Sequence, residues 1–230
     1  MLNTIREGIC YVKQTPALRA VLVRTAVCVP FASAIWALLP LLARHELELN
    51  CFEYGILFGF LGVGSVIGAI FLPKLRSHFS TDTLVAAATI MFAAATTALA
   101  EVRHFGLLCL ILMLAGMAWI TLMTSFNVAT QTAVPSLIRA RVLALYLLIL
   151  HGGMAAGSVL WGSVTQHAGV AVALFGAAGG LLVSLVAMVW YPFGESKQTD
   201  STLLAGLRAA ESIPRVSTVA GPTLATSNYR

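Results

Sequence analysis

The sequence is short of charge. Only 10% of its 230 residues are charged, whereas 59% are hydrophobic, and the mean hydropathy is +0.89. A soluble domain uses about 25% charged residues to cover its surface. A surface exposed only to water is therefore excluded, and the lipid bilayer is the first partner that the composition predicts.

Clusters of ligand or catalytic groups are also missing. The cysteines lie far apart, with no CxxC or Cys/His cluster, at Cys10, Cys28, Cys51 and Cys109. We interpret them as small hydrophobic side chains, and predict neither a disulfide nor a metal site. The segment HELEL at 45–49 lacks the second His of HExxH, and GxxxxGK[ST] does not occur. No cofactor is predicted, and an enzyme is the least favoured class.

What the chain does contain is long apolar stretches. A membrane-spanning helix needs about 20 mainly apolar residues. Tilted barrel strands are shorter and alternate in polarity, which excludes a β-barrel here. We predict an all-α membrane protein, a bundle of six transmembrane helices, with spans at about 17–43, 54–72, 83–100, 105–133, 142–164 and 170–191.

The distribution of Lys and Arg predicts the orientation of these spans. One side of the membrane collects eight basic residues, namely Arg6, Lys13, Arg19, Arg24, Lys74, Arg76, Arg139 and Arg141. The other side holds Arg44 and Arg103 beside four glutamates. The first side is therefore predicted to be cytoplasmic, with both termini on it, in the inner or plasma membrane. The formal charge of +5 is explained by this topology and gives no evidence for nucleic-acid binding.

The two ends of the chain differ from the spans. Residues 1–16 lack the continuous apolar core of a signal peptide. Their i, i+4, i+7 apolar spacing fits a cytoplasmic amphipathic connector, either a helix in the membrane interface or one packed on the protein. Residues 193–230 are rich in Ser, Thr, Ala and Gly, which predicts a disordered cytoplasmic tail.

Glycines mark the faces where helices are expected to pack closely. In the second span, Gly55, Gly59 and Gly62 share one face, and Gly64 and Gly68 share the opposite one. The motif GVGSVIG within it has no preceding strand, so a nucleotide site is not predicted.

The fifth span combines a small-residue patch with a second stripe. The patch consists of Gly152, Gly153 and Gly157. The stripe follows at i, i+3, i+7 and i+10, with His151, Met154, Ser158 and Trp161. Such a stripe is expected to face the bundle or a watery cavity. His151 is a candidate for proton coupling or substrate contact, and the alternative is a neutral His bonded to a neighbouring helix.

The first and fourth spans carry further candidates. Ser33 and Trp36 lie on one arc of the first span, where Arg24 is expected to extend to the interface. The fourth span has a bulky stripe that includes Trp119 and Met123. The end of this span overlaps the stretch NVATQTAVPSLIRARVLALY, residues 127–146, which leads into the fifth span. The stretch begins with the polar positions Asn127 and Gln131.

That stretch has three predicted roles. Asn127 and Gln131 form a cavity-side or interhelical polar face. Pro135 marks the end of the helix. Arg139 and Arg141 anchor the turn at the cytoplasmic headgroups.

The pattern N-x-x-x-Q-x-x-x-P-x-x-x-R-x-R followed by A-L-Y resembles the join between the tenth and eleventh spans of major facilitator superfamily transporters. The nearest branch is the enterobactin-exporter-like, or transmembrane secretion effector, group. Three further segments are similar to that branch in the same order, namely REGICYVKQTPALRAVLVR, FASAIWALLPLLAR and HGGMAAGSVLWG. The resemblance covers about residues 5–192 and matches only the C-terminal six-span half. Leu72 occupies the acidic position of the loop signature of the superfamily.

The resemblance implies secondary export of a siderophore-like, drug-like or other amphipathic small molecule by alternating access, with an N-terminal six-span half as partner. It implies that the first and fourth spans line the cavity, that the second and fifth meet the other half, and that the third and sixth face lipid. The alternatives are a non-transporting remnant or scaffold that packs against another membrane protein, and a homodimer of halves.

Overall fold

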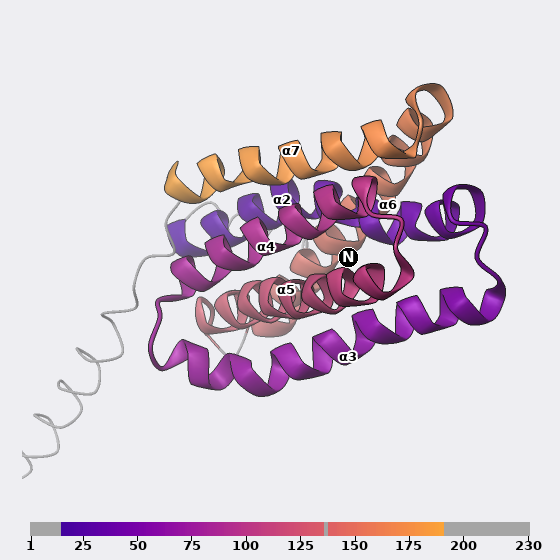
Figure 1. Ribbon diagram of the computed structural model, residues 1–230. Coiled ribbons are helices and arrows are strands. Elements are labelled where there is room, and N and C mark those ends of the chain that lie inside the picture. Colours follow the sequence, from indigo (N-terminus) through magenta and orange to yellow (C-terminus); the bar gives the residue numbers. More distant parts are fainter. Residues whose placement is uncertain (1–14, 136–137, 191–230) are drawn as a thin grey trace, which may run out of the picture. The chain divides into compact units, whose positions relative to one another are not determined.

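The computed structural model describes residues 15–135 and 138–190 (Figure 1). They belong to one compact unit, Met1–Phe193. The predicted tail at 193–230 and residues 1–14 of the predicted connector lie outside the described residues.

Regular structure in the described part of the chain is helical throughout, which confirms the all-α prediction. The first helix, α2, passes directly into a short π-helix, η1. The elements are α2 (Pro16–Leu41), η1 (Leu42–Glu46), α3 (Cys51–Arg76), α4 (Thr81–Glu101), α5 (Phe105–Thr132), α6 (Arg139–Ala168) and α7 (Val170–Trp190).

Each predicted span coincides with one of these helices. The ends differ by no more than four residues, at 72 against Arg76 and at 164 against Ala168. Helix α3 continues through Pro73 because this proline stands in the last turn, where one lost hydrogen bond is tolerated near a polar end. Five helices, α2 to α6, are long and apolar enough to cross a bilayer, and α7 has an apolar described stretch, Val170–Val186.

Local signals in the sequence set several helix ends. Asn50 and Glu53 form a reciprocal capping box at the start of α3, with both hydrogen bonds at 2.9 Å. Helix α5 ends at Thr132, before Pro135 as predicted. Gly169, with φ of +90°, joins α6 to α7, a backbone conformation that a side chain would strain. The antiparallel order of the helices follows from these short connections.

The six α-helices form two consecutive three-helix units, α2–α4 and α5–α7, and helices of one unit pack on helices of the other. The middle helix of each unit packs on the first helix of the other, so that α3 lies along α5 and α6 lies along α2. The last helices follow the same rule, because α4 packs on α5 and α7 packs on α2. This arrangement has the character of an internal structural repeat.

A short sequence match lies at corresponding points of the repeat. The tripeptide Gly-Ser-Val occurs at residues 64–66 in α3 and at residues 157–159 and 162–164 in α6. Gly64 and Gly157 lie against the backbone of the partner helix, at Met113 and Pro30, whereas Gly162 has nothing within 4 Å in the described chain. The repeat therefore uses the same small residue to bring its helices together.

Burial is distributed unevenly over the helices. Within the most apolar stretch of each, 56% of α2 and of α4 is buried, against 39% of α5, 28% of α3 and 17% of α6. Helix α4 had been expected to face lipid, but it is buried as much as α2 because α5 and α7 both pack on it. Helices α3 and α6 keep the most surface for partners outside the described chain.

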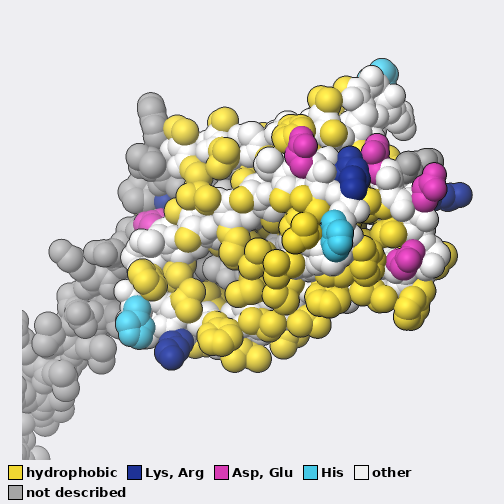
Figure 2. Space-filling view, viewed as in Figure 1, with side chains coloured by type: hydrophobic (Ala, Val, Ile, Leu, Met, Phe, Trp, Pro, Cys, Tyr) yellow, Lys and Arg dark blue, Asp and Glu magenta, His cyan; other side chains and the backbone are white. Residues whose placement is uncertain are grey.

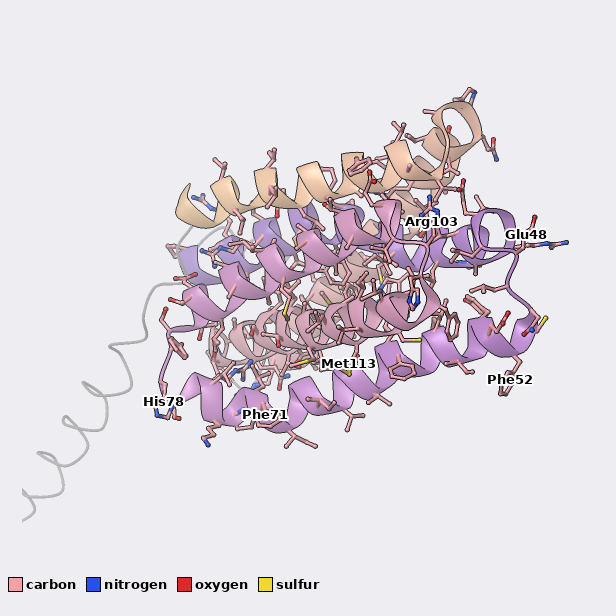
Figure 3. The ribbon with its side chains drawn as sticks, in the orientation of Figure 1. Glu48, Phe52, Phe71, His78, Arg103 and Met113 are labelled. Carbon is pink, nitrogen blue, oxygen red and sulfur yellow. The ribbon has the colours of Figure 1, made fainter. Side chains whose placement is uncertain are left out.

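Charged side chains gather toward the ends of the helices, and hydrophobic ones cover the face between them (Figure 2). We call the end with Lys74, Arg76, Arg139 and Arg141 the basic end, and the end with Glu46, Glu48, Glu53 and Glu101 the acidic end. Figure 3 shows Glu48 and Arg103 at one end and His78 at the other. At the acidic end, Arg103 pairs with Glu46 at 3.4 Å.

Candidate functional site

The contact between α2 and α6 is built around a proline in the middle of α2. Gly157 lies so close to Pro30 that an added Cβ would stand 2.8 Å from the Pro30 Cα. The Pro30 carbonyl accepts hydrogen bonds from the Ser33 hydroxyl at 2.8 Å and from Trp161 Nε1 at 2.9 Å. Since Ser33 is fully buried and Trp161 is only 7% exposed, both side chains support the helix contact.

The contact between α3 and α5 is the equivalent one. An added Cβ at Gly64 would overlap the Met113 backbone, and one at Gly116 would overlap the Leu61 backbone. The Ser65 hydroxyl donates to the carbonyls of Leu61 at 3.0 Å and Gly116 at 3.2 Å. Figure 3 shows Met113 between the two helices. Close backbone approach at small residues is how membrane helices associate without a hydrophobic driving force.

The other glycine face of α3 has no neighbour among the described residues. An added Cβ at Gly55, Gly59 or Gly62 would meet nothing within 4 Å of the described chain. The apolar side chains on this face are exposed, namely Phe52, Val66 and Ile70, and Figure 3 shows Phe52 directed away from the bundle. Of the two faces predicted to pack, the Gly64 and Gly68 face packs within the described bundle. The opposite one is available to another molecule.

Helix α6 has a comparable open stripe. Gly153 and Gly157 lie against α2, whereas Gly152 has nothing within 4 Å in the described part of the chain. Leu148 and Val159 are 69% and 75% exposed. The predicted small-residue patch is therefore divided between a buried side and an open side. Residues next to each other in sequence are about 100° apart on a helix, which accounts for the division.

His151 lies on the exposed side of α6. It stands near the middle of this 30-residue helix, and its Nδ1 is 2.9 Å from the Leu147 carbonyl oxygen. The ring is exposed in the described structure. An ionisable side chain at this depth in a membrane protein faces protein or water, not lipid. The open stripe of α6 is therefore a candidate surface for contact with another protein or with water.

Five aromatic side chains from four helices follow one another in a continuous series, which we call the aromatic ladder. Successive ring centroids are 6.1, 5.7, 5.4 and 5.9 Å apart along Tyr54, Phe58, Trp36, Trp119 and Phe92. Phe58 is 42% exposed and Phe92 only 1%. The series thus runs from an accessible ring into the core.

The polar end of α5 differs from the ladder. The Gln131 side-chain amide donates to Asn127 Oδ1, one turn away on the same helix. Nearby, Arg76 of α3 donates from Nη2 to the Ser125 hydroxyl at 3.3 Å. Asn127, Gln131 and Met123 are partly exposed, so this face of α5 is accessible toward the basic end.

Arg24 does not extend to the interface as expected. The residue is 2% exposed, and its Nη1 donates to Asp82 Oδ1 at 2.6 Å. Asp82 lies in the first turn of α4, which brings a carboxylate beside α2. A buried guanidinium requires such a partner. The pair could not be predicted from the sequence because the two residues are 58 positions apart.

The structure separates the nine cavity candidates into two groups. Ser33 and Trp161 lie in the α2–α6 contact, because Trp161 is only about 40° around α6 from Gly157. The others keep part of their surface exposed, namely Trp36, Trp119, Met123, Asn127, His151, Met154 and Ser158. Tyr54, Phe58 and Phe92 were missed, since only the tertiary structure brings them beside Trp36 and Trp119. Arg139 and Arg141 are exposed at the start of α6.

These features define a class: a multi-pass helical membrane bundle with an internal three-helix repeat, as in transporters built from repeated units. A comparison with family models then assigns the chain. The model for transmembrane secretion effectors of the major facilitator superfamily matches residues 1–230, and the chain belongs to this family of membrane transporters. No curated protein and no solved structure matches the chain.

Proposed function

We propose that this chain forms one half of a secondary exporter of small amphipathic molecules, and that it works by alternating access with a second six-span half. The second half would pack on the open faces of α3 and α6. Either the same polypeptide or a separate one would supply this second half. The basic end would lie in the cytoplasm, with the bundle in the inner or plasma membrane.

The position of His151 carries the proposal. An exposed imidazole near the middle of a 30-residue helix is costly against lipid. The position of this imidazole is favourable when protein or a water-filled path covers the open stripe of α6. The low buried shares of α3 and α6, 28% and 17%, support the same two faces as the contact surface.

The partly exposed faces of α2 and α5 support the transport role. The seven exposed cavity candidates come from α2, α5 and α6, the helices that the resemblance assigns to the cavity and the half-to-half contact. Their side chains are mostly aromatic, sulfur-containing or amide, with one imidazole. Such a mixed surface suits an amphipathic solute.

The test is the accumulation of fluorescent amphipathic dyes in efflux-deficient cells. Cells would express this chain, a six-span N-terminal half, both, or neither. We expect lower accumulation only with both. Coupled transport by this chain reconstituted alone as a monomer would refute the partner requirement. Co-purification of the two halves without any change in dye accumulation would favour the scaffold function instead.

A further inference from the structure

We infer that the aromatic ladder binds planar aromatic molecules that carry a hydrogen-bond acceptor. The ladder is formed by Tyr54, Phe58, Trp36, Trp119 and Phe92. The inference rests on the proposed function, because it names the substrate class of the proposed exporter.

The ladder spans a place where helices scarcely touch. Helix α3 packs along α5, and α2 packs along α6 and α7, but α2 and α3 have almost no backbone contact with each other. The rings of Trp36 and Phe58 connect the two helices, at 5.7 Å between centroids and an interplanar angle of 75°. Rings that join two helices without backbone contact can separate without breaking a helix–helix interface.

The exposure of the rings gives a route to the site. Phe58 is 42% exposed, and Trp36 and Trp119 are partly exposed. Rotation of the Phe58 side chain uncovers the Trp36 ring, and a flat molecule can then insert between the two rings and stack on both. Aromatic pairs favour offset or edge-to-face geometry at 4.5–7 Å, and all four spacings of the ladder lie in that range.

One buried polar atom of the ladder lacks a partner among the described residues. Trp36 Nε1 is buried and has no hydrogen-bond acceptor among the described residues. The indole N–H can only donate, and a buried donor without an acceptor is unfavourable. A ligand oxygen beside Trp36 would satisfy it.

Trp161 shows the contrast. Its Nε1 donates to the Pro30 carbonyl at 2.9 Å, and its ring lies against Phe31 and Gly176. Trp161 is thus a tryptophan whose ring and N–H are both used within the bundle. In Trp36 the ring is used and the N–H is not, which points to an acceptor from outside the described bundle.

The experiment measures binding of 2-naphthol to the chain in lipid nanodiscs, by the fluorescence anisotropy of the probe, with empty nanodiscs subtracted. Naphthalene lacks the acceptor oxygen, and decahydro-2-naphthol keeps the hydroxyl but is not planar. Both compete against 2-naphthol. We expect saturable binding of 2-naphthol, weaker competition by naphthalene, and no competition by decahydro-2-naphthol.

Two variants locate the binding. Phe58→Leu should weaken 2-naphthol about 2–10-fold, the equivalent of one aromatic pair. Phe71→Leu is the matched control, since Phe71 is a 52% exposed phenylalanine of the same helix outside the ladder, and it should leave binding unchanged. Trp36→Phe keeps a ring but removes the donor. It should therefore reduce the preference for 2-naphthol over naphthalene by about 2–10-fold, the equivalent of one hydrogen bond.

The preference is the ratio of the affinities for 2-naphthol and naphthalene, measured on the same variant. A general loss of stability lowers both affinities and therefore does not change this ratio. Equal binding of the saturated and aromatic probes, equal effects of Phe58→Leu and Phe71→Leu, or an unchanged preference in Trp36→Phe would each overturn the inference. If 2-naphthol binds but the assembled halves export no dye, the proposed function is refuted and the binding site is not. If the assembled halves export dye but 2-naphthol does not bind, the binding site is refuted and the proposed function is not.

Discussion

Two glycines of α6, five positions apart, have opposite surroundings. Gly157 is enclosed by Pro30 and Ser33, whereas Gly152 has open space within 4 Å in the described part of the chain. We predict that Gly157→Ala destabilises the bundle by about 1–3 kcal/mol, because the new methyl group meets backbone that cannot yield. Gly152→Ala should cause no loss.

Chemical unfolding of the two variants in the same detergent, followed by circular dichroism, would measure the difference. Equal midpoints for Gly157→Ala and Gly152→Ala would show that α2 and α6 do not approach as closely as described.

The buried ion pair gives a second prediction for single residues. Asp82→Asn removes the charge that faces Arg24, which is 2% exposed. The expected loss of stability is about 1–3 kcal/mol, below that of a fully buried pair because the Asp82 side chain is 37% exposed. Glu46→Gln breaks the exposed pair with Arg103 at the other end, and should change stability by less than about 0.5 kcal/mol.

Thermal unfolding of both variants at low and high salt checks this prediction. An effect of Glu46→Gln as large as that of Asp82→Asn would contradict the burial of Arg24.

Whole helices could be predicted from the sequence because hydropathy, proline and capping residues act locally. The predicted end of α5 before Pro135 and the start of α3 near its capping box illustrate this. Which face of a helix meets which neighbour is a tertiary property. For that reason the two glycine faces of α3 looked equivalent in sequence, although only the Gly64 and Gly68 face is packed within the described chain.

The same limit applies to the site. Trp36 and Trp119 were recognised as candidates on their own helices, but Phe58 and Phe92 belong to α3 and α4, whose patterns gave no reason to place them together. Trp161 shared a stripe with His151 in sequence, yet a rotation of about 80° between them around α6 is enough to bury one and expose the other.

The open face of α3 leads to a prediction at the scale of the element. Gly59→Leu places a large side chain where nothing lies within 4 Å of the described chain. The bundle should therefore fold normally, whereas packing of the second half on α3, and with it dye export, should be lost. Gly179→Leu on α7 is the matched control, because Gly179 also has open space but lies on a helix predicted to face lipid.

Export and co-purification of the second half would be measured together for both variants. Normal export by Gly59→Leu would remove α3 from the proposed contact surface. If Gly179→Leu reduces dye export as much as Gly59→Leu does, the effect is not specific to α3. The Gly59→Leu result would then give no support to packing of the second half on α3.

At the scale of the whole molecule, His151 distinguishes two roles for the exposed stripe of α6. If the imidazole takes part in proton coupling, His151→Gln should flatten the pH dependence of export, because glutamine cannot bind and release a proton. If it only completes a hydrogen-bonded contact with the second half, the variant should keep the wild-type pH profile at a lower rate. The pH profile of dye export by the assembled halves is the measurement.

The repeat of three helices and the open faces of α3 and α6 together describe a unit that is packed within and open on two outer faces among the described residues. Its inner contacts are closed by Gly64 and Gly157 against backbone. Its outer faces carry glycines without neighbours in the described chain and an exposed histidine. This combination is expected of one half of a two-half transporter.

The most direct test of this account is dye accumulation in efflux-deficient cells that express this chain with and without a six-span N-terminal half. The account predicts that accumulation falls when both halves are present and stays at the control level with either one alone. A fall produced by this chain alone, shown by crosslinking to be monomeric in the membrane, would contradict it.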